Sequence, residues 1–237
     1  IDTEGQLIAS VLSKKIAAGA SHVVIDIPVG PTAKVRSLEA GRQLGERLVD
    51  VASHFGVTLR CLYTDGSQPI GHGIGPALEA HDVLAVLQGH PEAPADLRER
   101  AVMVAGAVLE IGGAAPAGSG MQLALETLDS GRGWDKFQRI CAAQGGLRLP
   151  PRAAHVEPLL ATTSGRVGQI DNRKLSRLAK LAGAPQRAAA GVHVQLRRGD
   201  PVEVGQPLLF LHAQTRGELD YALDYARSAG EIVQVLR

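Results

Sequence analysis

Aromatic residues make up only 3% of this 237-residue sequence, so its interior has to be built from aliphatic side chains. Alanine, valine, leucine and isoleucine suit helices packed on a parallel sheet better than an all-β sandwich. Hydrophobic residues still account for 45% of the chain, which is enough for a sizeable core. The composition therefore favours an α/β fold.

An excess of charge of one sign is also missing. The chain has 25 lysines and arginines against 24 aspartates and glutamates, a formal net charge of +1. Proteins that bind nucleic acid by neutralising phosphates are usually far more basic, so we expect no nucleic-acid partner. No apolar run approaches the length of a membrane span and no signal peptide is recognisable, so we expect a cytoplasmic protein without membrane contact. The sequence begins with Ile1 rather than Met, and we expect a further segment upstream.

Several common site patterns are absent. The two cysteines, Cys61 and Cys141, form no CxxC pair, and the eight histidines include no HExxH motif, which argues against a catalytic zinc site. Gly71, Gly73 and Gly75 resemble a dinucleotide-binding fingerprint, but the third glycine comes one position too early. We therefore expect neither a zinc centre nor a dinucleotide site.

Apolar periodicity predicts alternating helices and strands over the first 150 residues. Leu7, Val11, Leu12 and Ile16 recur at helical spacing and predict a helix over residues 6–18. The β-branched run His22–Val29 predicts a buried parallel strand. The other predicted elements are a helix capped by Ser37, a strand over residues 57–63, and helices over residues 77–87, 95–110 and 121–128.

The pattern changes after Pro150-Pro151, where short alternating segments are broken by glycine and proline. Gly191–Ala213 predicts a strand, a turn and a second strand. We place a domain boundary near residue 152. The predicted fold class is α/β, with part of a mainly parallel mixed sheet flanked by helices, followed by a small C-terminal α+β domain with hairpins like those of a barrel-sandwich.

Several motifs occur in the order found in one enzyme family. Leu7–Lys15 (LIASVLSKK), followed by Val24–Ile27, resembles the thymidine and pyrimidine-nucleoside phosphorylases. Gly30–Val35 (GPTAKV) and Gly71–Ala80 (GHGIGPALEA) resemble the longer branch of that family, which includes the AMP phosphorylases. The resemblance covers nearly the whole chain, and it implies that the chain is the C-terminal portion of a member of this family.

The resemblance implies an arrangement of three parts. Residues 1–19 would be the remnant of an N-terminal helical domain, residues 20–152 part of the α/β phosphorylase domain, and residues 153–237 the C-terminal α+β domain. The family's glycine-rich phosphate loop would lie outside this sequence, so we expect these residues alone to be inactive. The family also implies a homodimer formed by the complete protein.

The resemblance assigns Ser10 and Lys14 to binding of the base and Lys14 to catalysis. The two residues are four apart, so their side chains share one face of a helix. A hydroxyl and an ammonium there could hold a pyrimidine edge and stabilise the departing base. Asp2 aligns with the acidic residue expected to protonate the base in AMP phosphorylases. Without the resemblance, Ser10 and Lys14 would be ordinary solvent-exposed residues and Asp2 a terminal one.

Lys34 aligns with a substrate-binding lysine of the AMP phosphorylases, which implies a contact with a 5′-phosphate. The stretch from Ile70 to Asp82 resembles the family's cation loop. There the carbonyl oxygens of Ile70 and Gly73 and the carboxylate of Asp82 would hold a monovalent or divalent cation, since hard cations take oxygen ligands. No other cofactor is expected. The alternatives are an exposed loop lysine and an ordinary glycine turn before a helix.

These expectations leave three functions open. The first is phosphorolysis of a pyrimidine nucleoside, in which thymidine and inorganic phosphate give thymine and 2-deoxyribose 1-phosphate. The second is a nucleotide phosphorylase that releases the base and ribose 1,5-bisphosphate from a nucleoside monophosphate. The third is a folded but inactive part that lacks the phosphate-binding loop.

Overall fold

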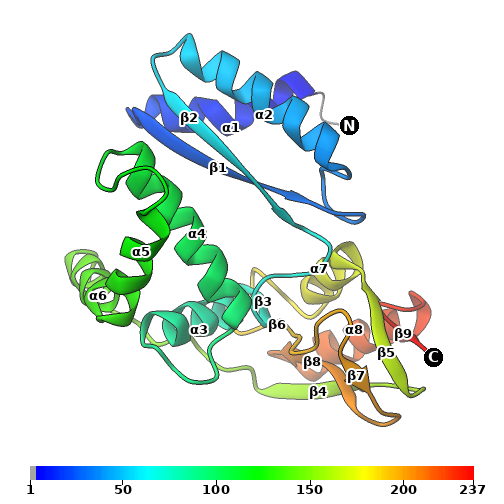
Figure 1. The fold of residues 1–237 in the computed structure, drawn as a ribbon. Coiled ribbons are helices and arrows are strands. Elements are labelled where there is room, and N and C mark those ends of the chain that lie inside the picture. The colour runs from blue at the N-terminus through cyan, green and yellow to red at the C-terminus, as the bar shows by residue number, and fades with distance from the viewer. Residues whose placement is uncertain (1–3) are drawn as a thin grey trace. The chain divides into compact units, whose positions relative to one another are not determined.

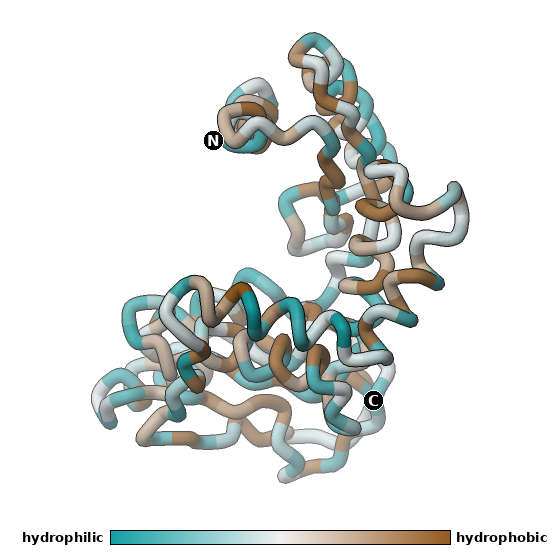
Figure 2. Tube along the Cα trace, turned by 90° about the vertical axis from the view of Figure 1, so that its left-hand side faces the viewer, coloured by the Kyte–Doolittle hydropathy of each residue, from teal (hydrophilic) through white to brown (hydrophobic). Residues whose placement is uncertain are grey.

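The computed structural model describes residues 4–237. The chain forms two compact units, each made of two stretches of sequence (Figure 1). The first unit comprises the described residues up to Gly66 together with Glu99–Ser130, and the second comprises Ser67–Arg98 and Gly131–Arg237. Along the tube in Figure 2, brown apolar stretches alternate with teal polar ones, as expected for elements with one buried face.

Two parallel strands form the sheet of the first unit. β1 (His22–Val29) pairs with β2 (Thr58–Asp65) over its whole length. The crossover between them is α2 (Leu38–Ser53), which begins where the Ser37 side chain accepts a hydrogen bond from the backbone N–H of Ala40 at 3.2 Å. A strand, a helix and a parallel strand in this order form the βαβ unit that the alternating pattern predicts.

α1 (Glu4–Ala17) completes the core of the first unit. Figure 1 shows α1 and α2 on one side of the strand pair. The buried cluster consists only of aliphatic side chains: Ile8, Leu12, Val23, Ile27, Leu44, Leu48, Ala52, Val57 and Leu59. The scarcity of aromatic residues is therefore met by close packing of medium-sized side chains, as the composition indicates.

Two further helices belong largely to the first unit. α4 (Ala95–Ile111) starts in the second unit and continues into the first, and α5 (Gly120–Asp129) follows it. Glu110 joins this region to β2, because one oxygen of its carboxylate accepts from Arg60 at 2.8 Å and the other from the backbone N–H groups of Gly118 and Gly120. The hydrogen bond from Arg60 is the main reason that the pKa of Glu110 lies below its usual value.

The second unit contains two antiparallel sheets. The larger has the strand order β3 (Gly73–Ile74), β6 (Gly191–His193), β8 (Pro207–Ala213) and β4 (His155–Leu160). The smaller has the order β7 (Pro201–Val202), β5 (Gly165–Ile170) and β9 (Val233–Leu236). These short, hairpin-rich strands match the expected C-terminal α+β character.

Four helices lie in the second unit: α3 (Pro76–Leu87), α6 (Arg132–Ala143), α7 (Asn172–Leu181) and α8 (Arg216–Ser228). α7 and α8 bury their aliphatic faces in the same core as β8, where Leu175, Leu178, Leu211 and Leu219 are fully covered. In the described part of the chain, no helix combines the length and apolarity needed to cross a bilayer.

The predicted fold class is confirmed, whereas the sheet details differ. Residues 73–74, which the sequence analysis assigned to the α/β domain, form β3 and pair with β6 of the antiparallel sheet. The second compact unit therefore includes Ser67–Arg98, a segment that comes before the boundary expected near residue 152. The division into residues 1–19, 20–152 and 153–237 stays a prediction.

Candidate functional site

Ser10 and Lys14 lie on the exposed face of α1, one turn apart. The opposite face carries Ile8 and Leu12, which are buried in the core of the first unit. That burial fixes the rotation of the helix, so the hydroxyl and the ammonium both face outwards and share one side. Their predicted roles in base binding are compatible with this placement. Asp2, the predicted proton donor, lies outside the described residues.

Lys34 lies in the loop that follows β1, at the carboxyl end of a parallel strand. The loop is closed by hydrogen bonds from the backbone N–H of Gly30 to the carbonyl of Val35 and from that of Ala33 to the carbonyl of Gly30. The Lys34 side chain is exposed. Ligands of open α/β sheets bind at this end of the strands, so Lys34 is placed where it can meet an anion.

A polar cluster that the sequence analysis missed joins β1, β2 and α4. Asp26 accepts a hydrogen bond from the Thr64 hydroxyl at 2.6 Å and forms an ion pair with Arg100 at 2.8 Å. Arg100 also donates to the carbonyl of Asp65. Both carboxylate oxygens are engaged, so Asp26 fixes α4 to the strands. An acidic residue within the apolar run of β1 was the signal for this contact.

The glycine-rich loop before α3 is held by Asp82. One oxygen of this buried carboxylate accepts hydrogen bonds from the backbone N–H groups of His72 and Gly73, each at 2.7 Å. Glu79 accepts from the N–H of Gly75 at 3.0 Å. Gly71 has a φ of +74°, and a β-carbon there would meet the Asp82 carboxylate. The glycine allows the loop to fold tightly around that side chain.

Arg197 supports the same loop from the other side. Its guanidinium pairs with Asp96 at 3.0 Å and donates to the carbonyl of Gly71 at 2.9 Å. The other oxygen of Asp96 accepts from the Gly71 N–H at 3.3 Å. The loop backbone is therefore tied to the carboxylates of Glu79 and Asp82 on α3, and to Asp96 and Arg197, which are more distant in sequence.

The predicted cation ligands are only partly brought together. Gly73 touches Asp82 through its N–H and not through the carbonyl oxygen that a cation would need, and Ile70 has intermediate exposure. The described residues contain no group of three or more His, Cys, Asp or Glu side chains arranged to hold a metal. One Asp82 oxygen already receives two donors, and the cation stays a prediction.

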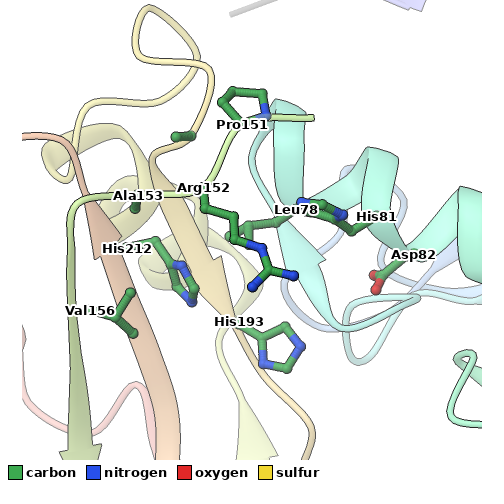
Figure 3. Close-up of a pocket in the computed structure, with 10 residues that line it drawn as sticks. Leu78, His81, Asp82, Pro151, Arg152, Ala153, Val156, His193 and His212 are labelled. Carbon is green, nitrogen blue, oxygen red and sulfur yellow. The ribbon is translucent and has the colours of Figure 1, made fainter. Parts of the chain in front are cut away.

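A cavity of about 400 Å³ lies in the second unit (Figure 3). Its polar lining comes from His81 and Asp82 on α3, Arg152 before β4, His193 on β6 and His212 on β8. Its other lining residues are Leu78, Pro151, Ala153, Val156 and Ala189. The histidines are far apart in the sequence, and no local sequence pattern predicts that β6 lies beside β8.

The histidine rings form a chain of edge contacts. The ring centroids of His72 and His193 are 5.6 Å apart, and those of His193 and His212 are 6.3 Å apart. Burial lowers the pKa of His193, and the neighbouring His72 lowers it further. Burial and then His193 lower the pKa of His212 in the same way. The neutral rings therefore dominate at neutral pH, each with one donor and one acceptor nitrogen.

The chain is similar to known proteins over nearly its whole length. Residues 166–233 match the model of the pyrimidine nucleoside phosphorylase C-terminal domain. A protein of Tolumonas auensis named "Putative thymidine phosphorylase" is 67% identical over 99% of this chain and 46% of its own length. Relatives with the same printed name from Parvibaculum lavamentivorans and Legionella pneumophila are 67% and 53% identical over 99% and 98% of this chain.

The chain spans about half the length of the curated relatives it matches. The matched domain model runs from β5 to the first residue of β9 in the second unit, and the relatives extend the similarity to α1 and the loop that carries Lys34. The resemblance noted in the sequence motifs is thus confirmed by two separate comparisons. The chain therefore resembles the thymidine and pyrimidine-nucleoside phosphorylases over nearly its whole length, and residues 166–233 match the C-terminal domain of the pyrimidine nucleoside phosphorylases.

Proposed function

We propose that the complete protein carrying this sequence cleaves a pyrimidine nucleoside with inorganic phosphate, and that α1 supplies part of its base site. The observation that carries this proposal is the placement of Ser10 and Lys14. Both side chains are exposed on the same face of a helix whose other face is anchored in the core. The names of the relatives, which refer to thymidine phosphorylase, support the same activity.

The proposed reaction gives a role to both the Ser10 hydroxyl and the Lys14 ammonium. A phosphate oxygen forms a bond to C1′ of the sugar while the C1′–N bond breaks, and the bonding electrons leave with the base. The base therefore gains negative charge in the transition state, and an ammonium held beside it lowers the barrier. Lys14 would supply that charge and Ser10 a hydrogen bond to the base edge. Asp2 would deliver the proton that the departing base takes up.

A nucleotide phosphorylase is the second candidate, and Lys34 is the observation that favours it. Its exposed ammonium lies at the carboxyl end of β1, on a loop of small residues that a phosphate could approach closely. A 5′-phosphate bound there would make nucleoside monophosphates the substrates and ribose 1,5-bisphosphate a product. The third hypothesis, a folded but inactive part, applies to residues 1–237 without the rest of the protein.

One comparison of substrates tests these candidates. Phosphate-dependent base release is measured for the complete protein with thymidine, uridine, AMP and CMP under the same conditions. Preference for thymidine or uridine would support the nucleoside reaction, and preference for AMP or CMP the nucleotide reaction. No release from any of the four would contradict both. The same assay on residues 1–237 alone tests the expectation of inactivity.

Homodimer formation is a further proposal that depends on the family resemblance alone. Light scattering on the complete protein during size-exclusion chromatography gives its mass directly. A mass of one chain at micromolar concentration would contradict this proposal.

A further inference from the structure

The cavity of the second unit is lined by several side chains that can donate hydrogen bonds. Arg152, His81, His193 and His212 all line it, and Figure 3 shows the Arg152 side chain reaching into the space between the two half-buried rings and α3. Within the part of the chain that the structure describes, the Arg152 guanidinium has no ion-pair or hydrogen-bond partner. Two other arginines of the second unit, Arg187 and Arg197, are both paired with carboxylates.

The rings of His193 and His212 are also open on the cavity side. The two rings are tilted against each other, and the His193 ring is also tilted against that of Phe210. No hydrogen bond joins the ring nitrogens of His193 or His212 to another described residue. A half-buried imidazole without a protein partner is available to a ligand or to solvent. Two such rings beside a guanidinium form a convergent set of donors, which suits an oxyanion.

Asp82 gives the cavity a second polar end. One of its oxygens receives the N–H groups of His72 and Gly73, which offset its charge. The carboxylate remains an acceptor for neutral donors such as hydroxyl groups. A cavity with a cationic group and two imidazoles on one side and an acceptor on the other favours a ligand that carries both an oxyanion and hydroxyls.

The volume and the walls restrict the ligand further. A cavity of about 400 Å³ is within the range of small-molecule sites and larger than a bare phosphate ion needs. The side chains of Leu78, Pro151 and Val156 give it an apolar wall. Such a wall can cover the C–H face of a sugar ring while the polar groups bind its substituents.

We propose that this cavity is a binding site for a sugar phosphate, with the phosphate bound by Arg152, His193 and His212 and the sugar hydroxyls directed towards Asp82. Phosphate is favoured over carboxylate because three separate donor groups converge, and a phosphate monoester offers three terminal oxygens to accept from them. The site is built entirely from the second unit and does not depend on the proposed roles of Ser10, Lys14 or Lys34.

Isothermal titration calorimetry tests this site, with the complete protein in phosphate-free buffer and ribose 5-phosphate as the probe. Arg152→Gln is expected to weaken binding about tenfold or more, because it removes the only charged donor of the set. The matched control is Arg148→Gln, an exposed arginine of the same connection that does not line the cavity. Ribose without phosphate should bind far more weakly than ribose 5-phosphate.

Two further arms separate this site from the proposed function. In the Lys34→Ala protein, binding that persists and is then lost on adding Arg152→Gln belongs to the cavity. Melting temperatures of the variants test whether unfolding causes the loss of binding. We expect them to be unchanged by Arg152→Gln, since Arg152 is exposed. Absence of binding by the unaltered protein, or equal affinities for Arg152→Gln and Arg148→Gln, would overturn the proposal.

Discussion

The carboxylate of Asp82 lies 2.7 Å from the backbone nitrogen of Gly73, and the same oxygen is equally close to the nitrogen of His72. Because Asp82 is only 8% exposed, these two hydrogen bonds are shielded from water. We predict that Asp82→Ala lowers the free energy of unfolding by about 3 kcal/mol, since two backbone donors lose a charged acceptor. Asp82→Asn keeps an oxygen and should cost less. Urea denaturation measures both values, and equal losses would contradict this assignment.

The cation loop gives a second prediction. If Ile70, Gly73 and Asp82 bind a cation, K⁺ or Mg²⁺ raises the melting temperature of the protein in a concentration-dependent way, because the ion binds only the folded chain. Asp82→Asn should remove this dependence. Choline chloride at equal ionic strength is the control for general salt effects. Identical melting curves in all three salts would show that the loop needs no ion.

The histidines of the cavity predict a dependence of stability on pH. Burial lowers the pKa values of His193 and His212 in the folded state, with contributions from the neighbouring His72, His81 and Arg197, whereas Asp82 opposes the shift of His193. The unfolded chain, with histidine pKa values of about 6.5, therefore binds protons first as pH falls. The stability that these rings provide is fully present above about pH 6.5 and is lost as pH falls through the folded-state pKa.

Urea denaturation at pH 8 and pH 5.5 measures this effect. The loss of stability at the lower pH should be smaller in His212→Gln, which removes one of the two rings. His54→Gln, an exposed histidine outside the cavity, is the matched control and should behave like the unaltered protein. A His212→Gln protein with the full pH dependence would rule out this explanation.

Lys14→Ala in the complete protein should lower the rate of base release about 100-fold, because the departing base loses its cation. Lys15→Ala is the natural comparison, since it removes a neighbouring lysine about 100° further around α1. Initial rates of phosphate-dependent base release give both effects. Unchanged turnover in Lys14→Ala would exclude the proposed role.

Lys34→Ala separates nucleotides from nucleosides. If its ammonium binds a 5′-phosphate, kcat/KM for AMP or CMP should fall about tenfold or more, while the values for thymidine and uridine change little. Arg36→Ala changes another exposed cation that follows the same loop and serves as the control. Equal losses for nucleotides and nucleosides would refute a 5′-phosphate contact.

The elements with strong local signals were predictable. The β-branched run His22–Val29 forms β1 with the predicted bounds, and Ser37 caps α2 through its side chain. In contrast, the sequence pattern predicts no helix at residues 172–181 or 216–228, although α7 and α8 bury apolar residues at helical spacing. Their caps were present in the sequence, since Asp171 caps α7 and Thr215 forms a capping box with Glu218.

The candidate sites also differ in how far the sequence predicts them. Ser10 and Lys14 could be placed on one face of a helix from their spacing alone, and the structure has them on such a face. The cavity could not be foreseen, because His193 and His212 become neighbours only through the register that pairs Gly191 with His212 and His193 with Phe210. Arg152 joins them from a segment without regular structure, for which the sequence offers no periodic signal.

The pairing of β3 with β6 affects the order in which parts of the chain can fold. A strand of only two residues, Gly73–Ile74, is synthesised more than a hundred residues before its partner Val192–His193. It has to wait for most of the remaining sequence, so formation of this sheet is a late, long-range event in folding. A product cut at residue 152 would leave one side of β6 without its partner and expose an unpaired edge that favours aggregation.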